Sequence, residues 1–224
     1  MYASPYGKAY FRNIQNKLNK LDTNQVFILS IDPWSLSSTT TDPNDTLNFR
    51  ENKSYLTGIS NPNQKINYGY LFNYFDESYY KILTKNATAI LQDNGWLEVT
   101  LPEDSISVER RRSFTIAGYQ NKIDQYHFSS VRYDYLIKTI AYLKNFGTVY
   151  LVRLPVHPTL MSLENQLIPD LNNRIQTAID LSNGYLDMSP DNAMLRYTDG
   201  VHLTKESGEA VSKKIGRWII KKAE

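Results

Sequence analysis

Asp199 and His202 are the two residues of this sequence whose types and spacing best suit acid–base chemistry. An Asp and a His three positions apart on a turn can hydrogen-bond, so the carboxylate fixes the tautomer of the imidazole and stabilises its charged form. The other ring nitrogen then works as a base. We expect a carboxylate oxygen to lie roughly 2.6–3.2 Å from the nearer ring nitrogen, and the far nitrogen to face an open rim.

This pair is two-thirds of a nucleophilic triad, and an activated serine would complete it. A serine in a Gly-Asp-Ser-like setting after an early strand is not in the sequence. Ser30 and Ser35 are the serines predicted nearest to the rim, but neither sits in a Gly-flanked turn between a strand and a helix. Because Asp-x-x-His also occurs by chance, and an Asp beside a Gly is an ordinary turn, the catalytic interpretation depends on the surrounding elements.

Polar side chains also follow the ends of two other predicted strands. In open α/β sheets, functional residues gather at the carboxyl edge of the strands, so three separate segments are expected to form one rim. Asp32 could equally well cap a turn, and His157 could be a rim residue without a chemical role. The residues expected to join the pair at the rim are Ser30, Asp32, Ser35, Arg153 and His157.

Short apolar runs alternate with amphipathic patterns along the chain. The runs at 25–31 and 148–154 are each followed by a proline and are typical of strands buried on both faces, and a short third strand is predicted at 185–187. This alternation predicts an α/β fold with a parallel sheet covered on both sides. Helices are predicted at 5–20, 124–146, 162–182 and 204–222.

The chain is expected to be a single domain, 1–224, with an insertion at 35–121. Within the insertion, 66–92 is rich in aromatic residues and is predicted to be helical, whereas 93–121 is predicted to be irregular. The aromatic residues suit a core or an interface, and a sugar-stacking platform is the second interpretation. The basic cluster Arg110 to Arg112 suits a solvated surface, although it could also hold acidic sugars.

Composition excludes several classes of function. A net charge of +2 is too small to indicate a nucleic-acid partner, and the absence of cysteine excludes disulfides and thiolate metal sites. No apolar run approaches the length that spans a bilayer. His127, His157 and His202 could form a zinc site on paper, but no tight ligand spacing supports one. We therefore expect no metal and no cofactor.

The segment from Asp199 to Leu203, followed by a helix with Gly208 and Ala210 near its start, resembles the last motif of the SGNH (GDSL-like) hydrolases. The resemblance implies a flavodoxin-like three-layer α/β/α fold. It also implies that His202 is the general base and that Asp199 orients it.

Two further segments, 28–33 and 151–158, resemble the third and fourth strands of envelope-associated members of this family, which act on cell-surface polysaccharides. This likeness implies ester hydrolysis or acyl transfer on a carbohydrate or acyl-ester substrate, with O-acetylated polysaccharide as the substrate class. It also implies a location in the cell envelope.

The sequence departs from the family pattern in its first three motifs. The serine of the first, the glycine of the second and the Gly-x-Asn-Asp of the third have no counterpart. We expect the chain to begin after the first two strands of the fold, which makes 25–31 an edge strand and the chain alone inactive. The alternative is a non-catalytic carbohydrate-binding or envelope assembly protein on the same fold.

Overall fold

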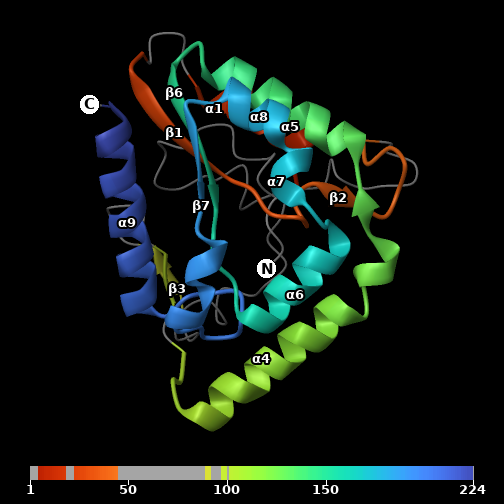
Figure 1. Cartoon of the computed structure of the whole chain (residues 1–224), viewed down its shortest axis with the longest axis vertical. Helices are drawn as coiled ribbons and strands as arrows, with labels where there is room; N and C mark the ends of the chain where they lie inside the picture. Colours follow the sequence, from red (N-terminus) through yellow and green to blue (C-terminus); the bar gives the residue numbers. More distant parts are fainter. Residues whose placement is uncertain (1–4, 19–22, 45–88, 92–96, 100, 224) are drawn as a thin grey trace, which may run out of the picture.

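The computed structural model of the chain describes residues 5–18, 23–44, 89–91, 97–99 and 101–223 (Figure 1). The fold is mixed α/β, with a three-stranded parallel sheet flanked by helices. The strand order is β1-β6-β7, and Val26 of β1 lies opposite Thr148 of β6. The sheet consists of β1 Gln25–Ser30, β6 Gly147–Arg153 and β7 Gly184–Asp187.

The central strand β6 is buried on both faces, as its apolar sequence predicts. Side chains alternate between the faces of a strand, so Val149 and Leu151 pack on one side and Val152 on the other. In the described sheet β1 is an edge strand, which confirms the prediction for 25–31. Two of its apolar side chains are correspondingly exposed, Val26 at 55% and Ile28 at 49%.

Helices cover the two faces of the sheet (Figure 1). On one face, Leu136 and Ile140 of α5 are fully buried against Val149 and Leu151 of β6. Leu136 and Ile140, four positions apart in the sequence, therefore belong to the buried stripe of α5. On the other face, Val211 of the C-terminal helix α9 packs with Val152 of β6, and Leu186 of β7 lies against the same cluster. The helices of these layers are α1 Lys8–Lys17, α5 Ser130–Leu143, α8 Gln176–Leu181 and α9 Lys205–Ala223.

Two small antiparallel pairs accompany the main sheet. The strands β2 Ser37–Ser38 and β5 His127–Phe128 pair with each other, and the short 3-10 helix η3 Ile123–Gln125 precedes β5. Because these elements occupy its beginning, the helix predicted at 124–146 begins only at Ser130, with the Ser129 hydroxyl capping it. The second pair consists of β3 Ala89–Leu91 and β4 Leu97–Val99.

The prediction of one continuous helix at 162–182 is wrong. It is divided into α6 Pro158–Leu167, α7 Leu171–Arg174 and α8, and Ile168 and Asp170 lie between the first two. Proline lacks the N–H that a helix interior requires, so Pro169 ends the pattern. Asp170 then takes a left-handed conformation with φ 62°.

The irregular structure predicted at 93–121 is also wrong, because α4 Ser105–Gln120 is a regular helix. The side chain of Asp104 caps it by accepting a hydrogen bond from Ser107 N at 2.9 Å. Ile106 and Phe114 are 81% and 82% exposed. The apolar residues of this helix therefore do not all lie on its buried face, and the sequence shows no regular helical spacing of apolar residues. The helix predicted at 66–92 is wrong at 89–91, which is β3, and the remainder lies outside the described residues.

The other boundaries differ less. The helix predicted at 5–20 begins at Lys8, and a 3-10 helix η4 Ser189–Met194, which was not predicted, leads from β7 toward the Asp199 turn. None of the helices in the described ranges is long and apolar enough to cross a membrane.

Candidate functional site

The turn between η4 and α9 brings Asp199 and His202 together. Asp199 Oδ2 lies 2.7 Å from His202 Nδ1, which confirms the predicted contact. Asp199 Oδ1 accepts hydrogen bonds from the backbone N–H of Val201 at 3.0 Å and of His202 at 2.8 Å. Both carboxylate oxygens are therefore fixed by groups of the same turn.

Gly200 allows the turn to close. Its φ is 95°, a conformation that residues with a side chain rarely adopt, and a Cβ there would lie 3.2 Å from Leu160 Cδ1. Its carbonyl oxygen accepts a hydrogen bond from His157 N at 2.9 Å, which ties the turn to the start of α6. The Thr198 N–H donates to the His202 carbonyl oxygen at 2.8 Å and closes the turn from the other side.

The hydrogen bond with Asp199 decides which ring nitrogen of His202 is left available. Burial alone raises the pKa of Asp199, but the hydrogen bonds from the ring and backbone of His202 outweigh burial and lower this pKa to about 2. An ionised carboxylate can only accept, so Nδ1 of a neutral His202 carries the proton and Nε2 carries the lone pair. The His202 side chain is 48% exposed. Within the described part of the chain Nε2 has no hydrogen-bond partner, so it is available to act as a base.

Two depressions meet at His202. A small pocket of about 240 Å³ extends toward Trp34, Tyr119 and Glu164, and a larger groove of about 650 Å³ extends along the exposed face of β1 toward α9. Ser30 lines both of them together with His202, and Asp32 lines the small pocket. The structure thus brings two of the five predicted rim residues into the same depressions as the histidine.

Ser35 and Arg153 lie beneath the rim. Ser35 is fully buried, and its hydroxyl donates to the Asp32 carbonyl oxygen at 2.8 Å. Its N–H donates to Asp32 Oδ1 at 2.8 Å, so Asp32 caps a turn in addition to lining the pocket. Arg153 is 6% exposed, and its Nη2 donates to Glu164 Oε2 at 3.2 Å. Neither Ser35 nor Arg153 lines the small pocket or the groove.

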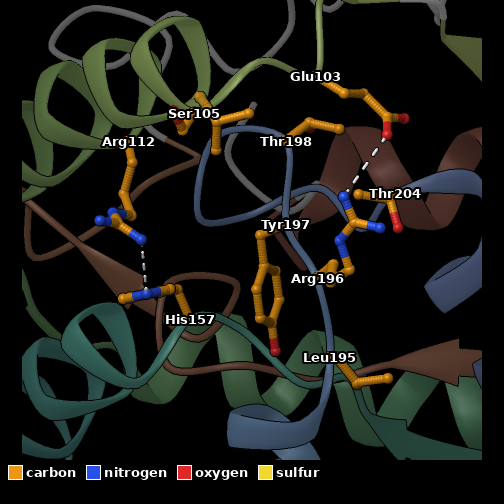
Figure 2. Close-up of a pocket in the computed structure, with 10 residues that line it drawn as sticks. Glu103, Ser105, Arg112, His157, Leu195, Arg196, Tyr197, Thr198 and Thr204 are labelled. Atoms are coloured by element: carbon orange, nitrogen blue, oxygen red, sulfur yellow. Dashed lines mark hydrogen bonds and ion pairs between the residues drawn. The ribbon is translucent and has the colours of Figure 1, made fainter.

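His157 belongs to a different pocket, of about 330 Å³, which Figure 2 shows. Its Nδ1 accepts a hydrogen bond from Thr159 N at 3.3 Å and so caps α6, while its Nε2 faces Arg112 Nη1 at 3.3 Å (Figure 2). Partial burial and then the Arg112 guanidinium lower the pKa of His157. Tyr197 packs edge-on against the ring at 5.8 Å between centroids. These contacts give His157 a positioning role beside the Asp199 turn.

Three residues at or near the site were not among the predicted rim residues, although two of them belong to the basic cluster for which a solvated surface was predicted. Arg111 Nε donates to the Thr198 carbonyl oxygen at 3.0 Å and so braces the turn from α4. Arg112, one position further along, holds His157. Glu164 is 4% exposed and lines the small pocket. Only Glu164 leaves a signal in the sequence, as an acidic residue on the apolar face of α6 that buries Leu160 and Leu163.

Among the described residues, no group of three or more His, Cys, Asp or Glu side chains could hold a metal ion. No protein-family model, curated protein or solved structure is significantly similar to the chain.

Proposed function

We propose that this chain is an SGNH-type esterase or acyltransferase domain, in which His202 acts as general base and Asp199 orients it. The observation that carries the proposal is the 2.7 Å contact between Asp199 Oδ2 and His202 Nδ1, on a histidine side chain that is 48% exposed. The parallel order β1-β6-β7 suits three neighbouring strands of a flavodoxin-like sheet. Asp199 and His202 follow the last of these strands, at the edge where such folds carry their functional residues.

The chemistry is acyl transfer through a serine. Nε2 of His202 removes the proton of the serine hydroxyl as its oxygen attacks the ester carbonyl carbon, and Asp199 stabilises the imidazolium that forms. The tetrahedral oxyanion collapses, the carbon–oxygen bond to the alcohol breaks, and the leaving oxygen takes the proton from His202. A water molecule or an acceptor hydroxyl then removes the acyl group by the same steps in reverse order.

We place the nucleophile outside the residues that the structure describes. Ser35 is buried and donates its hydroxyl to the Asp32 carbonyl oxygen, so it is unsuitable. Ser30 shares both depressions with His202, but in the described residues its hydroxyl makes no hydrogen bond with Nε2. It also lacks the glycine-flanked strand-to-helix turn that exposes a nucleophilic serine.

The serine is tested with a fluorophosphonate probe followed by intact-mass measurement and peptide mapping. Neither Ser30 nor Ser35 is expected to carry an adduct. The polypeptide expressed from the complete reading frame is expected to carry an adduct on a serine outside the described residues. That adduct should disappear in His202→Ala.

Two outcomes would contradict this assignment. An adduct on Ser30 that His202→Ala abolishes would make Ser30 the nucleophile and the described chain an enzyme by itself. A folded polypeptide from the complete reading frame with neither adduct nor turnover would remove the hydrolase proposal.

A non-catalytic carbohydrate-binding or envelope assembly protein on the same fold is the second candidate. It is favoured by one observation, that Nε2 of His202 has no hydrogen-bond partner among the described residues. The probe separates the two candidates, because the second predicts sugar binding without an adduct on any serine.

A further inference from the structure

The pocket of about 330 Å³ that His157 lines together with Arg112 and Arg196 (the His157 pocket) is distinct from the two depressions at His202, because His202 does not line it (Figure 2). Arg112 belongs to α4, and Arg196 follows η4. Among the described residues of the lining, Glu103 is the only acidic one. Two positive charges against one negative charge favour an anionic ligand.

His157 faces a hydrogen-bond donor at each of its ring nitrogens. Nδ1 accepts from the Thr159 N–H at 3.3 Å, and Nε2 lies 3.3 Å from Arg112 Nη1. Partial burial and then Arg112 lower the pKa of His157, so the ring is neutral at neutral pH and has one lone pair. Because Thr159 uses this lone pair, Nε2 carries a proton that faces the Arg112 guanidinium. These two N–H groups therefore converge on a point where the described residues supply no acceptor.

Two further donors line the same pocket. Arg196 Nη2 lies 3.8 Å from Glu103 Oε2, which is too long for a hydrogen bond, so in the described part of the chain the guanidinium makes none. Thr204 is 4% exposed, and its Oγ1 accepts from Ser207 N at 3.5 Å. The proton of this buried hydroxyl has no acceptor among the described residues. Both side chains therefore have donors left for a ligand.

A tetrahedral oxyanion suits this set of donors. One oxygen can accept from Arg112 Nη1 and His157 Nε2 together, because two donors 3.3 Å apart both lie within hydrogen-bond distance of a common acceptor. The other oxygens of a tetrahedral group point in different directions and are available to Arg196 and Thr204. A carboxylate offers only two oxygens in one plane, which is fewer than the donors of the pocket.

We propose that the His157 pocket binds a phosphate or sulfate group, with one of its oxygens between Arg112 and His157. Arg196 and Thr204 donate to the remaining oxygens. Hydrogen bonds from guanidinium groups to such an anion are charge-assisted and are among the strongest that proteins make. Binding of this group needs neither a nucleophile nor turnover, so the inference does not depend on the proposed function.

The His157 pocket adjoins the larger groove, since Glu103 and Thr198 line both of them. The groove in turn reaches His202. The remainder of a ligand that is anchored by a phosphate or sulfate group therefore has room in the groove.

The test is an NMR titration of the 224-residue chain with sulfate, phosphate and acetate at neutral pH and constant ionic strength. Sulfate and phosphate are expected to shift the side-chain signals of His157 and Arg112 saturably, and acetate is not. A preference for one of the two oxyanions supports the site and identifies the group that it takes. Long-range ¹H–¹⁵N spectra of the free chain are expected to show the proton of His157 on Nε2.

Arg112→Gln removes one of the two converging donors and is expected to weaken the binding of both oxyanions about tenfold. Arg110→Gln is the matched control, because it removes the same charge from α4 but lines a different depression, and it should leave binding unchanged. Glu103→Gln removes the carboxylate that competes for Arg196, so binding should strengthen about threefold. This variant decides the question where Arg112→Gln fails to fold.

Four results would overturn the proposal. The first is a folded wild type whose signals neither sulfate nor phosphate shifts saturably, and the second is binding of acetate in preference to both. The third is oxyanion binding that Arg112→Gln and Glu103→Gln both leave unchanged, or that Arg110→Gln weakens as much as Arg112→Gln does. The fourth is a free chain with the proton of His157 on Nδ1, because the two donors would then not converge.

Discussion

Asp199→Asn tests the central pair without any need for turnover. The pKa of Asp199 is about 2 in the folded chain against an ordinary value of 3.8, because the hydrogen bonds from His202 outweigh the opposing effect of burial. A carboxyl group with a lowered folded-state pKa stabilises the fold above its unfolded pKa, and this stabilisation is lost as the pH falls through the folded pKa. The shift corresponds to about 2 kcal/mol of unfolding free energy at neutral pH.

Urea unfolding of the wild type and of Asp199→Asn from pH 7 down to pH 2 measures this contribution. The variant is expected to be about 2 kcal/mol less stable at pH 7, and the difference should shrink between about pH 4 and pH 2. Asp191→Asn is the matched control, because its carboxylate pairs with Lys214 Nζ at 2.6 Å on a half-exposed surface. An exposed pair of this kind contributes about 1 kcal/mol or less.

The same variant should reverse the tautomer of His202. An asparagine that turns its oxygen to the backbone N–H of Val201 and His202 turns its NH₂ to the ring, so Nδ1 becomes the acceptor and Nε2 carries the proton. Long-range ¹H–¹⁵N spectra of the imidazole distinguish the two tautomers. A variant with unchanged acid stability, or with the proton still on Nδ1, would refute the orienting role of Asp199.

Two further predictions concern the surroundings of the pair. Gly200→Ala is expected to cost about 1–3 kcal/mol in a urea melt, because φ 95° is strained for alanine and the new Cβ meets Leu160 at 3.2 Å; a loss below about 0.5 kcal/mol would show that the turn relaxes freely. The pKa of Glu164 is shifted in the opposite direction to that of Asp199, because burial and then Asp32 raise it from 4.5 to about 8. The stabilisation of the fold by this carboxyl group is therefore present at low pH and is lost as the pH rises through that range. Glu164→Gln should therefore flatten the fall in stability between about pH 5 and pH 8, and an unchanged slope would show that this carboxyl group ionises normally in the fold.

Much of the fold was predictable because its signals are local. The apolar runs ending before Pro33 and Pro155 predicted β1 and β6. The period of α4 was hidden because Ile106 and Phe114 face solvent, which no count along the chain reveals. Prediction therefore succeeded where burial follows the period of the element, and failed where it does not.

The sequence by itself determined the Asp199–His202 contact, since two residues three positions apart on one turn meet wherever that turn is placed. Only the tertiary structure decided what surrounds the pair. In the folded chain Ser35 is buried in a turn, and His157 contacts Arg112 in a separate pocket. Glu164 and Asp32 both line the small pocket. A side chain's partners and the pKa of a buried carboxyl group depend on segments far apart in the chain that pack together, and residue spacing carries no information on that packing.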